Sequence, residues 1–236
     1  MIPDIFISIL FTPSFSFAFF VWLIAHYTLV KHRMEGAGRI SATIALTLTC
    51  WFVLVIVISK TRLFAINPLF APNIAFGFLL LFELLRRVYS SKTIQRIAEN
   101  APIALLMGIQ IYRILGISFL TLYSQNLLPA AFAIPAGWGD ILVGVTAPFV
   151  AALYYFGKPY GKKLAIIWNY VGILDLIVAI GVGTLAFPRP IQFMHTTPST
   201  ELFAMFPMAI VPLFAVPLSF VLHMLCLRVL KGNGTV

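Results

Sequence analysis

The feature that most constrains this chain is a series of long apolar runs separated by short polar connectors. Seven runs occur, at residues 5–30, 40–59, 72–88, 102–122, 129–156, 164–187 and 202–230. A helix needs about 20 apolar residues to cross a bilayer, and only 10% of this chain is charged where a soluble domain has about 25%. We therefore predict an all-α bundle of seven transmembrane helices, with residues 1–236 forming a single integral membrane domain in contact with lipid.

The distribution of basic residues predicts the orientation of the bundle. The net charge of +9 would suggest nucleic acid in a soluble protein, but here the basic residues lie in the connectors, so we expect no nucleic-acid partner. The first, third and fifth connectors and the C-terminus hold twelve Lys and Arg, and the other side holds three. The positive-inside rule then places the N-terminus outside and the C-terminus in the cytoplasm.

Three charged residues lie deep within the predicted spans. Arg113, Asp140 and Asp175 each fall about eleven residues into a run, which is about 16 Å along a helix. A lone charge at that depth costs at least a few kcal/mol, so these side chains are expected to face the interior and pair. With the nearby Gln110 and Asn169 they form the predicted site for a solute or ion.

The charge count of this site favours a coupled carrier. One arginine cannot neutralise two aspartates, and Glu83 at the end of the third run would add to the surplus if it reached inward. A desolvated carboxylate without a partner takes up a proton or holds a cation. We therefore expect a carrier for a small solute or cation, while a structural subunit whose buried pair fixes helix register is the alternative.

Small residues and prolines point to the same region. Small residues that permit close helix packing lie near the three charges, at Gly116, Ala136, Gly144, Ala147, Gly172, Ala179 and Gly183. Interior prolines remove a backbone donor and free the carbonyl four residues earlier. In the last run, Pro207, Pro212 and Pro217 would free the carbonyls of Phe203, Met208 and Leu213. Broken helices of this kind form binding sites in many transporters.

Two further patterns suggest other functions. Gly137-Trp-Gly-Asp140 resembles the G-x-G-D signature of intramembrane aspartyl proteases, with Asp175 as the second aspartate. In that family the order of the aspartates is reversed and a Pro-Ala-Leu segment follows. His26 and His223, on two different predicted helices, are residues of the type that ligates haem iron. Nothing else in the sequence resembles a cytochrome b, so we expect no cofactor. The sequence does not decide whether these histidines bind a ligand.

The second half of the chain resembles a group of uncharacterised polytopic bacterial inner-membrane proteins. The likeness rests on Gln110-Ile-Tyr-Arg113, on Pro135-Ala-Gly-Trp-Gly-Asp140, on Trp168-Asn169 with Gly172 and Asp175, and on the three prolines of the last run. It implies an integral inner-membrane protein and no particular activity.

The orientation can be tested with topology reporters. A reporter fused after Val236 and one inserted near Lys92 should both read as cytoplasmic, and one near Thr197 as external, because the positive-inside rule fixes these connectors. Compartment-specific enzyme fusions provide the measurement. A periplasmic signal near Lys92 would contradict the seven-span arrangement.

Overall fold

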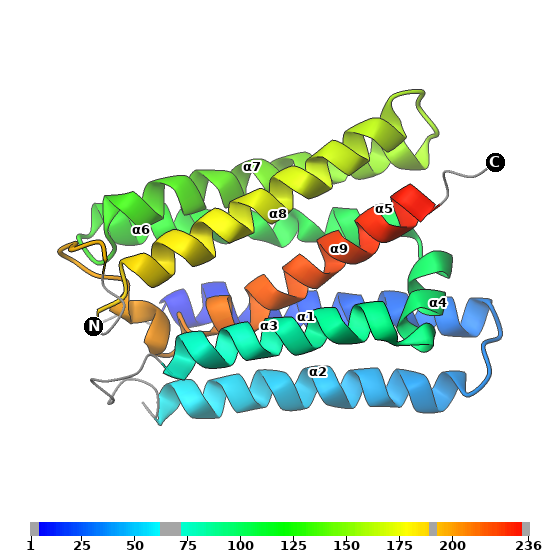
Figure 1. The fold of residues 1–236 in the computed structure, drawn as a ribbon, viewed down its shortest axis with the longest axis horizontal. Coiled ribbons are helices and arrows are strands. Elements are labelled where there is room, and N and C mark those ends of the chain that lie inside the picture. Colours follow the sequence, from blue (N-terminus) through cyan, green and yellow to red (C-terminus); the bar gives the residue numbers. More distant parts are fainter. Residues whose placement is uncertain (1–4, 62–71, 189–192, 233–236) are drawn as a thin grey trace.

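The fold is helical throughout the part of the chain that the computed structural model describes, residues 5–61, 72–188 and 193–232 (Figure 1). The elements in chain order are α1 (Ile5–Lys31), α2 (Ala37–Lys60), α3 (Pro72–Ser90), α4 (Lys92–Asn100), α5 (Ile103–Gly108), the 3₁₀ helix η1 (Ile109–Gly116), α6 (Ile117–Ser124), α7 (Ala130–Tyr155), α8 (Gly161–Leu185), the 3₁₀ helix η2 (Glu201–Ala204), the π-helix η3 (Val211–Ala215) and α9 (Val216–Gly232). The all-α prediction is confirmed for these residues.

Six helices in the described residues are long and apolar enough to cross a membrane. They are Ser8–Lys31, Ala37–Lys60, Ile103–Ser124, Ala130–Tyr155, Gly161–Leu185 and Val211–Gly232. This is the architecture of a multi-pass membrane protein. Helix α3 does not meet the same criterion because its 19 residues include Glu83, Arg86 and Arg87. A seventh crossing by α3 therefore stays a prediction.

Glu83 does not join the buried charges. Its carboxylate accepts from Arg86 Nε at 2.6 Å and from Arg87 Nε at 2.7 Å, and its side chain is 40% exposed. Spacings of three and four residues place these side chains on one helix face. The glutamate is thus neutralised within its own helix.

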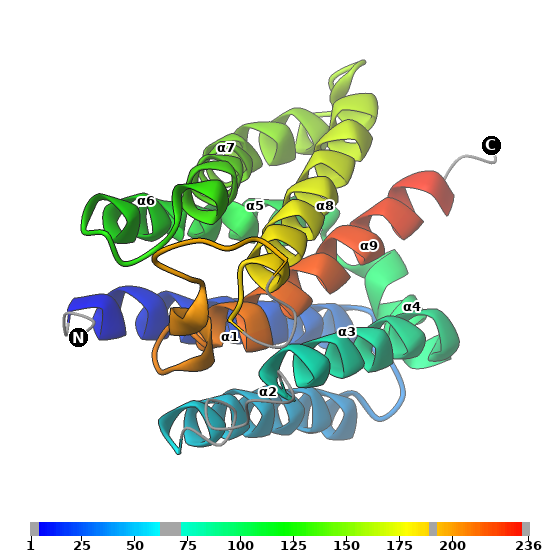
Figure 2. The same cartoon turned by 60° about the vertical axis from the view of Figure 1, so that its left-hand side comes forward.

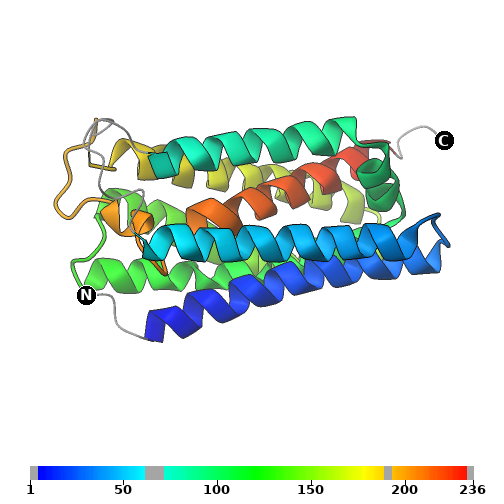
Figure 3. The ribbon, with the colours of Figure 1, turned by 90° about the horizontal axis from the view of Figure 1, so that it is seen from below.

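Helix α9 runs through the middle of the bundle. In Figures 1 and 2 it lies between α8 on one side and α3 on the other, and α7 packs against both α8 and η1. The α1–α2 and α7–α8 connectors, α4 and the C-terminal end of α9 all lie at one end (Figures 1 and 3). The twelve basic residues counted above belong to that end, so the fold gathers the positive charge as the sequence predicts.

The last apolar run is not one helix. We expected it to begin at residue 202, but the structure has the short η2, then a break, and a continuous helix only from Val211. Proline cannot donate to the helix ladder, and the carbonyl freed by Pro217 is used within the protein, since Trp51 Nε1 donates to Leu213 O at 2.9 Å. The Met208 carbonyl accepts from Val211 N at 3.1 Å. These two carbonyls are therefore occupied.

The helix that carries Arg113 changes from α-helical to 3₁₀ geometry at its centre. Between α5 and α6 the chain forms η1, eight residues of 3₁₀ helix. With three residues per turn, residues three apart align on one face. Gln110, Arg113 and Gly116 are the buried residues of η1, so the 3₁₀ geometry presents both polar side chains to the neighbouring helices.

Glycines bring α7 into backbone contact with η1. A Cβ added to Gly144 would lie 2.5 Å from the Ile114 backbone nitrogen, and one added to Gly116 would lie 2.7 Å from the Gly137 carbonyl oxygen. The close approach predicted from the small residues is confirmed at these positions. It is this approach that carries Arg113 to α7.

Gly144→Ala should lower the free energy of unfolding by about 1 to 3 kcal/mol, because its methyl group would force the two backbones apart. Chemical unfolding in detergent gives the measurement. Gly181→Ala in α8 is the control, because a Cβ there meets no atom within 4 Å. Equal losses in the two variants would contradict the packing argument.

Candidate functional site

The three buried charges meet at one point between η1, α7 and α8. Arg113 Nε donates to Asp140 Oδ1 at 2.7 Å, and Arg113 Nη2 donates to Asp175 Oδ2. The side chains are 1%, 19% and 11% exposed for Arg113, Asp140 and Asp175 respectively. The predicted pairing is confirmed with both aspartates. The expectation that one carboxylate has no partner is wrong, because a single guanidinium is shared.

His223 completes the ring of groups around the guanidinium. Arg113 Nη1 lies 3.2 Å from His223 Nε2 and 3.5 Å from the Gly172 carbonyl oxygen. A guanidinium can only donate, so Nε2 accepts and the ring proton sits on Nδ1. That nitrogen donates to Asn169 Oδ1 at 2.8 Å. The histidine in this network is therefore neutral.

Asn169 and Gln110 support the cluster without touching the aspartates. Asn169 orients His223 and anchors itself by donating from Nδ2 to Ala165 O at 2.8 Å. Gln110 accepts from Ser219 Oγ at 2.9 Å, which links η1 to α9. Tyr112 completes this second network, with its hydroxyl 2.6 Å from Ser219 Oγ. Sequence reasoning placed the first two residues at the site and missed Ser219, Tyr112 and His223.

A signal for the missed residues exists in the last run. Ser219 and His223 are four residues apart in an otherwise apolar stretch, so they lie on one face of a helix. Both are buried, at 0% and 1% exposure. That pair of polar side chains on one face indicates a polar partner inside the bundle.

Two glycines make room for the cluster. A Cβ on Gly139 would overlap the Asp175 carboxylate, and a Cβ on Gly172 would overlap the His223 ring. The Gly139 of the G-x-G-D sequence thus allows α8 to bring its aspartate against α7. In this structure that sequence acts through packing around Arg113.

The cluster carries one net negative charge when both carboxylates are ionised, because one arginine faces two aspartates and His223 is neutral. Arg113 lies between the two carboxylates and donates to both, whereas the two carboxylates of an aspartyl protease lie about 3 Å apart and face each other directly. His26 lies in a different network, 2.9 Å from Ser41 Oγ. Within the described residues no three His, Cys, Asp or Glu side chains gather as metal ligands would.

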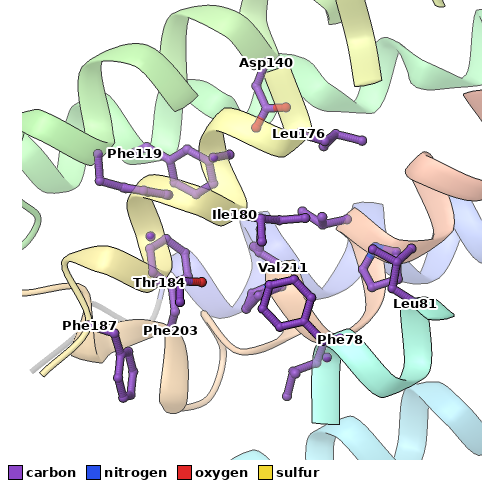
Figure 4. A pocket seen from close by; sticks show the side chains of 18 residues that line it. Phe78, Leu81, Phe119, Asp140, Leu176, Ile180, Thr184, Phe187, Phe203 and Val211 are labelled. Carbon is purple, nitrogen blue, oxygen red and sulfur yellow. The ribbon is translucent and has the colours of Figure 1, made fainter. Parts of the chain in front are cut away.

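A cavity of about 100 Å³ borders the cluster at Asp140 (Figure 4). It is lined by residues from α3, α6, α7, α8, η2, η3 and α9. Asp140 and Thr184 are the polar side chains in this lining, and the rest is apolar. Asp140 is therefore the member of the cluster that a molecule in this cavity can reach.

Comparison with known proteins gives a family and no further relative. Residues 69–231 match the family model described as a domain of unknown function (DUF8737). No curated protein and no solved structure matches the chain. The matched segment includes η1, α7, α8 and α9, so every residue of the cluster lies within it.

The shared arginine makes the stability effects strongly non-additive. Asp140→Asn or Asp175→Asn alone leaves a neutral arginine–aspartate pair and should change the free energy of unfolding little. The double variant leaves Arg113 as an unpaired buried charge and should lose about 3 to 5 kcal/mol, as should Arg113→Leu, which leaves the carboxylates without a cation. Unfolding in detergent measures all four variants. Small and additive losses would show that no shared pair holds the helices.

Proposed function

We propose that this chain, which belongs to the family of the domain of unknown function DUF8737, is a membrane carrier that couples a proton to a small solute or cation. The observation that supports the proposal is the sharing of Arg113 by Asp140 and Asp175 next to a cavity. The coupling site is the cluster, and the solute site is the cavity beside Asp140. The carrier lies in an inner membrane with its N-terminus outside.

Electrostatics gives this cluster a reason to bind a cation. An uncompensated charge in a low-dielectric interior costs several kcal/mol. A proton on one carboxylate, or a monovalent cation beside it, removes the surplus. Because both species neutralise the same charge, binding of one favours release of the other, which is the requirement for exchange.

The position of the cluster suits alternating access. Arg113 lies at the middle of the Ile103–Ser124 span, and substrate sites of many transporters lie near the midplane between broken helices. The 3₁₀ helix η1 carries Arg113, and the π-helix η3 borders the cavity. Such mid-helix irregularities often mark hinges or functional sites, so both elements that would have to move are adjacent to the site.

The charge surplus separates a carrier from a structural subunit. A pair that only fixes helix register is complete with one arginine and one aspartate. The second aspartate adds cost and no further registry, because α8 could meet Arg113 through a neutral side chain. The surplus carboxylate therefore favours a binding role.

Infrared spectroscopy of the reconstituted protein tests the proposed coupling site. Lowering the pH from about 9 to 4 should produce the carbonyl band of a buried protonated carboxyl group. The band should be missing from Asp140→Asn and from Asp175→Asn, because each leaves a neutral cluster that needs no proton.

Glu83→Gln is the matched control for this experiment. Glu83 is already paired with two arginines and is 40% exposed, so its loss should leave the band unchanged. A wild-type protein without the band, or a band that survives in both aspartate variants, would favour the structural role.

A further inference from the structure

We infer that the cavity beside Asp140 binds an organic cation whose uncharged part is apolar and can pack against aromatic rings. The inference rests on the proposed function and names its substrate class. It derives from the lining of the cavity, the charge at its inner end and its opening toward the outside of the bundle.

The lining favours a molecule with an apolar body. Five phenylalanines contribute to it, four from helices α3, α6, α7 and η2 and one from the segment after α8: Phe78, Phe119, Phe132, Phe203 and Phe187. Figure 4 labels Phe78, Phe119, Phe187 and Phe203 around the space below Asp140, with the Thr184 hydroxyl among them. A strongly hydrated ion or a sugar would lose its hydrogen bonds to water here and find few replacements. Aromatic faces also attract cations.

The inner end of the cavity selects for positive charge. Asp140 Oδ1 accepts from Arg113, and in the described residues Oδ2 has no hydrogen-bond donor. The guanidinium itself is 1% exposed behind the carboxylates and cannot be reached. A ligand therefore meets a negative group at this end, and an anion would be repelled.

The cavity reaches the outer surface of the helices. Phe78 of α3 lines it and is 50% exposed. Helices α3 and α8 lie on opposite sides of α9 (Figure 2), and both contribute to the walls. In the seven-span arrangement, in which α3 crosses the bilayer, this opening faces lipid, where amphipathic organic cations concentrate. The ligand would enter sideways, with its charged end leading toward Asp140 and its apolar body following along the phenylalanines.

Binding of the cation should release a proton. The charged and titratable groups facing Asp140 are Arg113 and Tyr112 of η1, Asp175 of α8 and, beyond the arginine, His223 of α9. When the cluster holds one proton it is neutral, and a monovalent cation beside Asp140 restores neutrality only if that proton leaves. One cation in and one proton out balances the charge.

Benzyltrimethylammonium is the probe for this site, because it has one aromatic ring and a permanent charge. Titration calorimetry on protein in nanodiscs should show saturable binding, and a weakly buffered sample should release about one proton for each cation bound. Neopentylbenzene, which replaces the charged nitrogen with carbon, should bind at least about tenfold more weakly, since it lacks the ion pair.

Variants locate the binding in this cavity. Asp140→Asn should weaken binding at least about tenfold and abolish proton release. Phe78→Ala should weaken binding by a factor of about 2 to 5 through loss of its contact with the aromatic ring of the probe. Phe82→Ala is the matched control, since Phe82 is 68% exposed on the same helix and does not line the cavity. It should bind as the wild type does.

The outcomes separate this inference from the proposed function. No saturable binding of the cation, or equal binding of neopentylbenzene, would overturn the inference even if the infrared carboxyl band is present. Binding that Phe78→Ala and Phe82→Ala weaken equally would also overturn it. If the cation binds in the cavity without proton release and the infrared carboxyl band is missing, the ligand class is upheld and the proposed proton coupling is contradicted.

Discussion

The guanidinium of Arg113 is the group on which the rest of the structure depends. It donates to Asp140 on α7, to Asp175 and Gly172 on α8, and to His223 on α9. Because its side chain is 1% exposed in a bundle of apolar helices, water cannot replace any of these partners. Three helices must therefore converge on one side chain of η1.

The irregular features of the bundle follow from this convergence. The 3₁₀ geometry of η1 turns Arg113 and Gln110 to one face, and Gly144 lets α7 lie against the backbone of η1. Gly139 and Gly172 leave the space that the Asp175 carboxylate and the His223 ring occupy. These glycines therefore act by making the polar contacts possible.

The pairing of the buried charges could be predicted from the sequence, because an unpaired buried charge is too costly. The position of His223 and the cavity could not, because both depend on how the helices pack. A buried Arg113 needs a carboxylate, so its pairing with Asp140 or Asp175 could be expected from depth alone. His223 could not be placed in the same way, because the last helix was expected to begin at residue 202. It begins at Val211, which puts His223 near the middle of the span. The cavity also escaped prediction, since it depends on where α3 lies against η3.

The central claim, that two aspartates share one arginine and bind one exchangeable proton, can be measured by NMR. The chain contains three aspartates, Asp4, Asp140 and Asp175, so labelling the side-chain carboxyl carbon of aspartate gives three signals. Between about pH 9 and 4, the signals of Asp140 and Asp175 should together report the uptake of one proton, as expected for a coupled pair. The account would be contradicted if both carboxyl groups stay ionised throughout this range, or if they titrate independently as free carboxylates do.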